Sequence, residues 1–224
     1  KSKLVTELAT NSSKSLILLA GVGGTGKTIT MLQVASSVHT DKAERSLFLT
    51  YNIALASDVQ RLISLAKIRS EDQEGGIRIQ TVYSFFYTLL SKLGLQEGLQ
   101  EENDGYEDYS TSLEILKDHL KDNIDHVKTL ISENPYEFEF DRVFVDEAQD
   151  WHQIEAEILK LIYADVTICV ADGRQQMVRV QKKANWFQGI AKDVRKFISL
   201  NTSLRQKSGL ASFISGLAGN LKQE

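Results

Sequence analysis

Apolar residues fall into two kinds of stretch along this chain. Short, mostly apolar runs bounded by polar or glycine positions indicate buried strands, and they occur at residues 16–20, 46–50, 77–80, 142–145 and 166–171. Longer stretches with apolar residues three or four positions apart predict helices. They occur at residues 29–38, at about 54–67, from the end of the strand at 77–80 to about residue 93, at 113–132 and at about 154–163. Strand and helix therefore alternate along most of the sequence.

This alternation predicts an α/β fold, in which a parallel sheet carries helices on both faces and binds ligands at the carboxyl ends of its strands. The stretch 95–112, rich in acids and glycines, predicts an exposed connection. Together with the helical stretch after it, it forms an insertion at 95–140. The remaining residues, 1–94 and 141–199, are expected to form the main lobe.

The segment after the first predicted strand carries the clearest chemistry. Residues 21–28 read G-V-G-G-T-G-K-T and fit the phosphate-binding pattern G-x-x-x-x-G-K-[ST] at every fixed position. Its backbone N–H groups can surround phosphate oxygens, and the following helix directs its positive end at them. The loop residues expected to do this are Gly21, Gly23, Gly24, Thr25 and Gly26.

Two side chains complete this P-loop. Lys27 is expected to neutralise the β- and γ-phosphates, and the Thr28 hydroxyl to ligate Mg²⁺. The alternative is a glycine-rich turn that binds nothing. Because a strand precedes the motif and a helix follows it, the sequence predicts a site for ATP and Mg²⁺.

A second candidate element follows the strand predicted at 142–145. Residues 146–150 read D-E-A-Q-D. We expect Asp146 to hold Mg²⁺ and Glu147 to polarise the water that attacks the γ-phosphate. Solvated acids at strand ends are common, so this segment indicates a nucleotide site mainly because a P-loop precedes it.

The 224 residues carry a net charge of −4, which is unevenly distributed. Between residues 95 and 140 there are 13 acidic and 3 basic residues, a net charge of −10, whereas the remainder has 23 basic and 17 acidic residues, a net charge of +6. The main lobe can therefore still bind a polyanion, because steering follows the local field.

Other compositional features favour a cytoplasmic, intracellular protein. Cys169 is the single cysteine and lies in an apolar run, which predicts a core position and excludes a disulfide within the chain. No run approaches the roughly 20 apolar residues of a membrane span, so no membrane partner is expected.

Taken together, these segments resemble the superfamily 1 DNA helicases of the UvrD/Rep-like branch, whose Walker B motif reads D-E-x-Q-D. Four further segments are similar to motifs of that family and occur in the same order. Residues 47–52 resemble motif Ia, residues 80–84 the T-F-H-S segment, residues 171–175 motif III and residues 203–206 motif IV. The resemblance implies a RecA-like P-loop NTPase lobe of an ATP-dependent helicase or translocase. Residues 200–224 would then begin a second RecA-like lobe, whose remainder is an expected partner.

The resemblance also implies roles for individual residues in the P-loop and beyond it. Glu147, Lys27, Gln175 and Arg205 would be catalytic, Arg205 reaching the γ-phosphate. Gln149 would bind the nucleotide and, with Gln175, link it to the DNA track. Single-stranded nucleic acid, expected to be DNA, would contact Thr50, Tyr51, Asn52, Thr81 and Tyr83.

The chemistry of these residues agrees with a surface that binds nucleic acid, because hydroxyl and amide groups form hydrogen bonds with phosphates and aromatic rings stack on bases. Thr and Tyr are also favoured in strands, so a structural role is the alternative. Tyr83 stands where the family has His, and the stacking Trp after motif III is missing. Trp186 could replace it, although packing is the more common use of such a residue.

Two other classes remain open. A P-loop ATPase that remodels or signals through protein would have no evident use for Gln149 and Gln175. A nucleotide-gated binding module without catalysis would keep the site and lack turnover.

Overall fold

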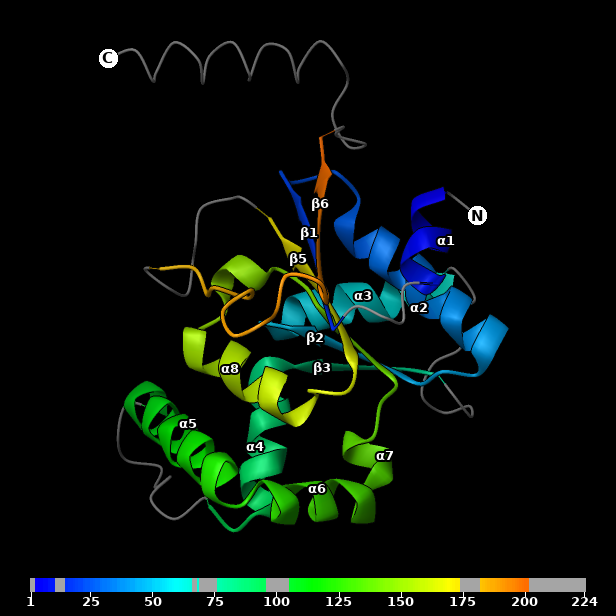
Figure 1. Cartoon of the computed structure of the whole chain (residues 1–224). Coiled ribbons are helices and arrows are strands. Elements are labelled where there is room, and N and C mark those ends of the chain that lie inside the picture. Colours follow the sequence, from blue (N-terminus) through cyan, green and yellow to red (C-terminus); the bar gives the residue numbers. More distant parts are fainter. Residues whose placement is uncertain are drawn as a thin grey trace, which may run out of the picture.

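The computed structural model describes residues 3–10, 15–65, 68, 76–95, 105–173 and 182–201. A six-stranded sheet forms its centre, in the order β3-β2-β4-β5-β1-β6 with every neighbouring pair parallel (Figure 1). The strands are β1 Leu16–Gly21, β2 Ser46–Thr50, β3 Ile77–Thr81, β4 Arg142–Val145, β5 Thr167–Asp172 and β6 Arg195–Leu200. The predicted α/β fold is therefore confirmed, with β6 as a strand that the apolar pattern did not predict.

Helices cover both faces of the sheet. They are α1 Lys3–Thr10, α2 Lys27–Lys42, α3 Ile53–Leu65, α4 Val82–Lys92, α5 Gly105–Asp122, α6 Ile124–Glu133, α7 Pro135–Phe138 and α8 Gln153–Ile162, with a 3₁₀ turn, η1, at Ala148–Asp150. One core contains α1, α2 and α3, and the other contains α4, α5, α6 and α8 (Figure 1). Among the described helices none is long and apolar enough to cross a membrane.

The four inner strands, β1, β2, β4 and β5, contribute side chains to both cores because successive side chains point to opposite faces. In β2, Leu47 and Leu49 enter the core under α4, whereas Phe48 enters the core under α2. There Phe48 stacks on Phe144 of β4, with ring centroids 6.1 Å apart. Strands buried on both faces read as continuous apolar runs, which is why the sequence revealed them. Cys169 is buried in the α2-side core, as predicted.

The insertion differs from its prediction. The exposed connection expected over 95–112 is wrong at its carboxyl end, because α5 already begins at Gly105. Tyr109, Leu113 and Leu116 are buried at helical spacing, so the apolar face of this helix starts one turn before the first leucine. The acidic residues around Tyr109 concealed that face in the sequence.

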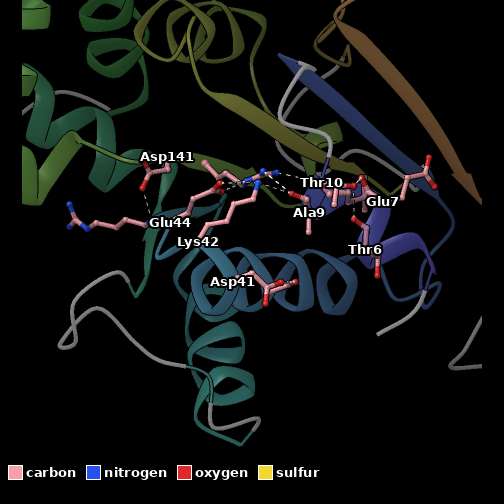
Figure 2. Close-up of polar contacts among 12 residues, drawn as sticks. Thr6, Glu7, Ala9, Thr10, Asp41, Lys42, Glu44 and Asp141 are labelled. Carbon is pink, nitrogen blue, oxygen red and sulfur yellow. Dashed lines mark hydrogen bonds and ion pairs between the residues drawn. The ribbon is translucent and has the colours of Figure 1, made fainter.

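One polar cluster holds α1 against the sheet. The buried Arg142 guanidinium donates to the carbonyls of Leu8 and Ala9, at 3.2 and 3.1 Å, and to the Glu44 carboxylate at 2.5 Å. Lys42 adds a contact of 3.4 Å to the Ala9 carbonyl at the end of α1. Figure 2 shows the Lys42 side chain beside Glu44, with which it forms an ion pair. These carbonyls belong to the last turn of the helix, where two cations satisfy groups without intrahelical partners.

Replacing Arg142 by Met should lower the free energy of unfolding by about 3 kcal/mol, because it removes the buried cation from the Leu8 carbonyl and leaves the Ala9 carbonyl and the Glu44 carboxylate with only the longer contacts from Lys42. Urea denaturation followed by circular dichroism measures the change. Lys121→Met, which breaks an exposed ion pair with Asp118 on α5, is the control and should have little effect. Equal stability of the Arg142 variant and the wild type would show that α1 is not held this way.

Candidate nucleotide and nucleic-acid sites

The P-loop forms a tight turn between β1 and α2. Gly24 and Gly26 have φ of 78° and 83°, a left-handed backbone that side chains rarely adopt. The Lys27 ammonium folds back and donates to the carbonyls of Gly21 and Val22, at 2.9 and 3.1 Å. The cation thus lies inside the loop, where phosphate oxygens can replace those carbonyls as its partners.

Thr28 and Asp146, the two predicted Mg²⁺ ligands, touch each other directly. The Thr28 hydroxyl donates to Asp146 Oδ2 at 2.8 Å, and the Glu147 N–H donates to Asp146 Oδ1 at 3.0 Å. The contact joins the first turn of α2 to the end of β4. A hydroxyl and a carboxylate supply the hard oxygen donors that Mg²⁺ prefers, so the pair fits the predicted ion.

Burial dominates the electrostatics of Asp146. Removal from water and, to a smaller extent, the negative charge of Glu147 raise the pKa of this carboxyl from 3.8 to about 6. The hydrogen bonds from Thr28 and from the Glu147 N–H, and the charge of Lys27, act in the opposite direction. An ionised Asp146 is thus costly until a cation arrives.

Glu147 is held from two directions. Its own backbone is left-handed, with φ of 46°, which is uncommon for a residue with a side chain. Gln149 Nε2 donates to Glu147 Oε2 at 2.6 Å, while Gln149 Oε1 accepts from the N–H of Gly173 at 2.7 Å. The Gln149 side chain, 3% exposed, therefore connects the acid to the residue that follows β5.

The P-loop, Ile29, Asp146 and Glu147 line one cavity of about 470 Å³. Helix α3 also lines it, with Leu55, Asp58, Val59, Arg61 and Leu62. The sequence had indicated no functional residue on α3, because its pattern is that of an ordinary amphipathic helix. Arg61 brings a second cation to the wall of the cavity.

The residues predicted to contact nucleic acid fall into two groups. Thr50 is fully buried, and its hydroxyl donates to the Asn52 carbonyl at 3.0 Å, so it shapes the turn after β2 rather than presenting a surface. Tyr51 and Asn52 are half-buried, and the Asn52 side chain accepts from the N–H of Leu55 in the first turn of α3.

Thr81 and Tyr83 line a second, shallower cavity of about 610 Å³ with Ile53 and Gln80. Tyr83 is 47% exposed and stacks on Tyr87 one turn along α4, with ring centroids 6.1 Å apart. The structure thus brings Thr81 and Tyr83 to one groove at the carboxyl end of β3.

Two predicted residues, Gln175 and Arg205, lie outside the described residues. Trp186 is buried, stands 5.5 Å from the Trp151 ring in an edge-on arrangement, and donates to the Ala148 carbonyl. It packs under η1, in agreement with the structural interpretation.

The parallel sheet with a P-loop at the end of β1 defines a RecA-like P-loop NTPase lobe. Residues 14–224 match the family described as Schlafen group 3, DNA/RNA helicase domain, and the chain belongs to this family. No curated protein matches it.

Among solved structures, the chain is similar to the crystal structure of Pif1 helicase from Candida albicans, with a TM-score of 0.53 and 19% identity. The similarity covers 96% of this chain and 42% of that one, so the chain spans less than half of the helicase it matches. At this identity the match establishes the fold, that of a helicase RecA-like lobe.

Replacing Asp146 by Asn should stabilise the nucleotide-free protein at pH 7.5 by about 2 kcal/mol, because it removes a buried charge while the amide oxygen can accept from the Glu147 N–H and the amide nitrogen can donate to the Thr28 hydroxyl. The folded-state pKa is raised, so the penalty grows as pH rises from about 4 to 6 and is constant above. The gain should therefore disappear toward pH 4. Urea titrations at several pH values measure it.

Asp118→Asn, at an exposed position on α5, is the matched control and should show no such gain at pH 7.5. An Asp146 variant less stable than the wild type at pH 7.5 would contradict the assigned effect of burial.

Proposed function

We propose that this chain is the ATP-binding motor lobe of an ATP-dependent DNA helicase or translocase, arranged as in the UvrD/Rep-like branch. The observation that carries the proposal is the Thr28–Asp146 contact at 2.8 Å beside Lys27 and Glu147. It supports a common site for a phosphate chain, a metal ion and a water-activating acid. ATP is the proposed nucleotide.

Each residue then has a defined task. The P-loop amides and Lys27 hold the phosphates, and Thr28 and Asp146 hold Mg²⁺, which when bound neutralises charge on the phosphate oxygens. Glu147 accepts a hydrogen bond from the attacking water, and Gln149 keeps its carboxylate in place. Gln175 and Arg205 keep the roles implied by the resemblance.

Nucleic acid is proposed to cross the carboxyl end of β2 and β3. The groove beside Thr81 and Tyr83 supports this, because an exposed aromatic ring next to hydroxyl and amide groups suits single-stranded nucleic acid. Thr50 is excluded from the surface by its burial. The charge of the acidic insertion repels phosphate, so we place the strand along the ends of β2 and β3 and not along the insertion, which borders this groove at Tyr109.

The proposed division of the chain follows from this assignment. Residues 1–94 and 141–199 form the ATPase lobe, 95–140 form an insertion packed on it, and 200–224 begin a second RecA-like lobe. Full turnover and movement along the strand need that second lobe, because charge stabilisation and alternating grip require both. An intracellular location fits the single, buried cysteine.

ATP turnover by the longest form of the protein, with and without single-stranded DNA or RNA, tests the function. Stimulation by an oligonucleotide supports a motor. Turnover that neither oligonucleotide changes would instead indicate a remodelling ATPase, and nucleotide binding without turnover a binding module. A larger stimulation by RNA than by DNA would correct the proposed substrate.

Glu147→Gln should keep nucleotide affinity and lower kcat by about 10²- to 10⁴-fold, because it removes the proton acceptor and leaves the phosphate contacts intact. Lys27→Ala should instead lose most nucleotide binding. Fluorescent ATP-analogue titration and steady-state turnover separate the two effects. Glu157→Gln, an acid on α8 paired with Lys117, is the control, and its turnover should match the wild type.

Tyr83→Ala should weaken binding of a single-stranded oligonucleotide by about 10- to 100-fold, since base stacking on one aromatic ring contributes about 1–3 kcal/mol. Tyr136→Ala removes another exposed tyrosine, on α7 beside Arg45 and Arg78, and should bind normally. Fluorescence anisotropy at low salt measures both. Equal affinities for the two variants would rule out the groove as the binding face.

A further inference from the structure

Gly173 lies beside two side chains of the proposed ATPase site, Glu147 and Gln149. It follows β5 directly, is buried, and donates its N–H to Gln149 Oε1 at 2.7 Å. The same Gln149 amide donates to Glu147 Oε2 at 2.6 Å. One side chain therefore connects the end of β5 to the carboxylate beside the P-loop.

The position has no room for a side chain. A Cβ atom on Gly173 would lie 2.8 Å from Glu147 Oε2, 2.9 Å from Gln149 Nε2 and 3.0 Å from Gln149 Oε1. Contacts this short force something to move. The backbone of Gly173 is not left-handed, so the requirement for glycine comes from space and not from conformation.

The atoms that would have to move are the ends of flexible side chains. No backbone atom is among the three nearest to the added carbon. A methyl group can therefore be accommodated by rotating Glu147 and Gln149, at little cost to folding. The change would fall on the hydrogen bond that orients the acid, because the three atoms nearest to the added carbon belong to the Glu147 carboxylate and the Gln149 amide, which form that bond.

We infer that Gly173 is a positioning residue for ATP hydrolysis: its missing side chain lets Gln149 join the end of β5 to Glu147 and hold that carboxylate in place. The inference rests on the proposed function and adds a residue to it that the P-loop and Walker B patterns do not contain. Its effect acts on the hydrogen bond between Gln149 and Glu147, because an added carbon would press on both of these side chains.

The test is Gly173→Ala in the longest form of the protein. We expect kcat for ATP to fall by about 10- to 100-fold, since a displacement of about 1 Å in a reacting group can cost that much. Nucleotide affinity should stay within about twofold, and the midpoint of thermal unfolding should be nearly unchanged. A fall in affinity or stability equal to the fall in kcat would overturn the inference, because it would indicate general damage.

Two further variants make the test specific. Gly189→Ala adds a methyl at a glycine with open space around it, far along the chain from the site, and should keep the wild-type kcat even if its left-handed backbone lowers stability. Gln149→Ala removes two of the three close contacts. Only the contact with Glu147 Oε2 then remains, so adding Gly173→Ala to Gln149→Ala should lower kcat less than Gly173→Ala does in the wild type, whereas an equal second decrease would contradict a role for the bond between Gln149 and Glu147.

A crystal structure of the Gly173→Ala protein decides the geometry without using turnover. We expect the contact between Gln149 Nε2 and Glu147 Oε2 to be broken or displaced. An unchanged contact of 2.6 Å would overturn the inference even if the wild type hydrolyses ATP. Absence of turnover in the wild type, with the contact displaced in the variant, would instead overturn the proposed function and leave the positioning effect in place.

Discussion

The parallel pairing of β1, β5 and β4 is the constraint on which the candidate site depends. Because these strands are neighbours and run in one direction, the residues that follow them meet at one edge of the sheet. Thr28 and Asp146 are 118 positions apart in sequence and still share a hydrogen bond. Gly173 follows β5, the strand between β1 and β4, and it is connected to Glu147 through the side chain of Gln149. No single segment contains the site, and the sheet assembles it.

Sequence reasoning succeeded where the signal is local. A buried strand, a glycine turn that needs left-handed backbone at Gly24 and Gly26, and a helix directly afterward leave a contiguous pattern of residues. The acids after β4 are equally local. The order of the strands is not, because β4 inserts between β2 and β5 after a long excursion of the chain. Nothing in the pattern of apolar residues specifies which strands become neighbours.

The failures concern side-chain environment. Thr50 and Thr81 both end strands and look equivalent in sequence, yet Thr50 is fully buried beside β4 and Thr81 lines an open groove at the outer strand. The position of each strand in the sheet makes the difference. The role of α3 as a cavity wall and the contact between Gln149 and Gly173 depend in the same way on packing between distant segments.

The insertion shows how packing overrides composition. Its acids Glu114, Asp118, Asp122, Asp125 and Glu133 are exposed. Tyr109, by contrast, enters the core of the lobe and donates to the buried Glu155 at 2.8 Å, and Glu155 also accepts from the His152 N–H at the start of α8. The Tyr109 ring lies 5.0 Å from Tyr83 of the proposed nucleic-acid groove. Moving the insertion away would leave a buried carboxylate short of a partner, which is costly. The insertion is therefore a fixed part of this lobe. Any movement of the lobe that accompanies nucleotide binding must either carry the insertion along or involve other segments.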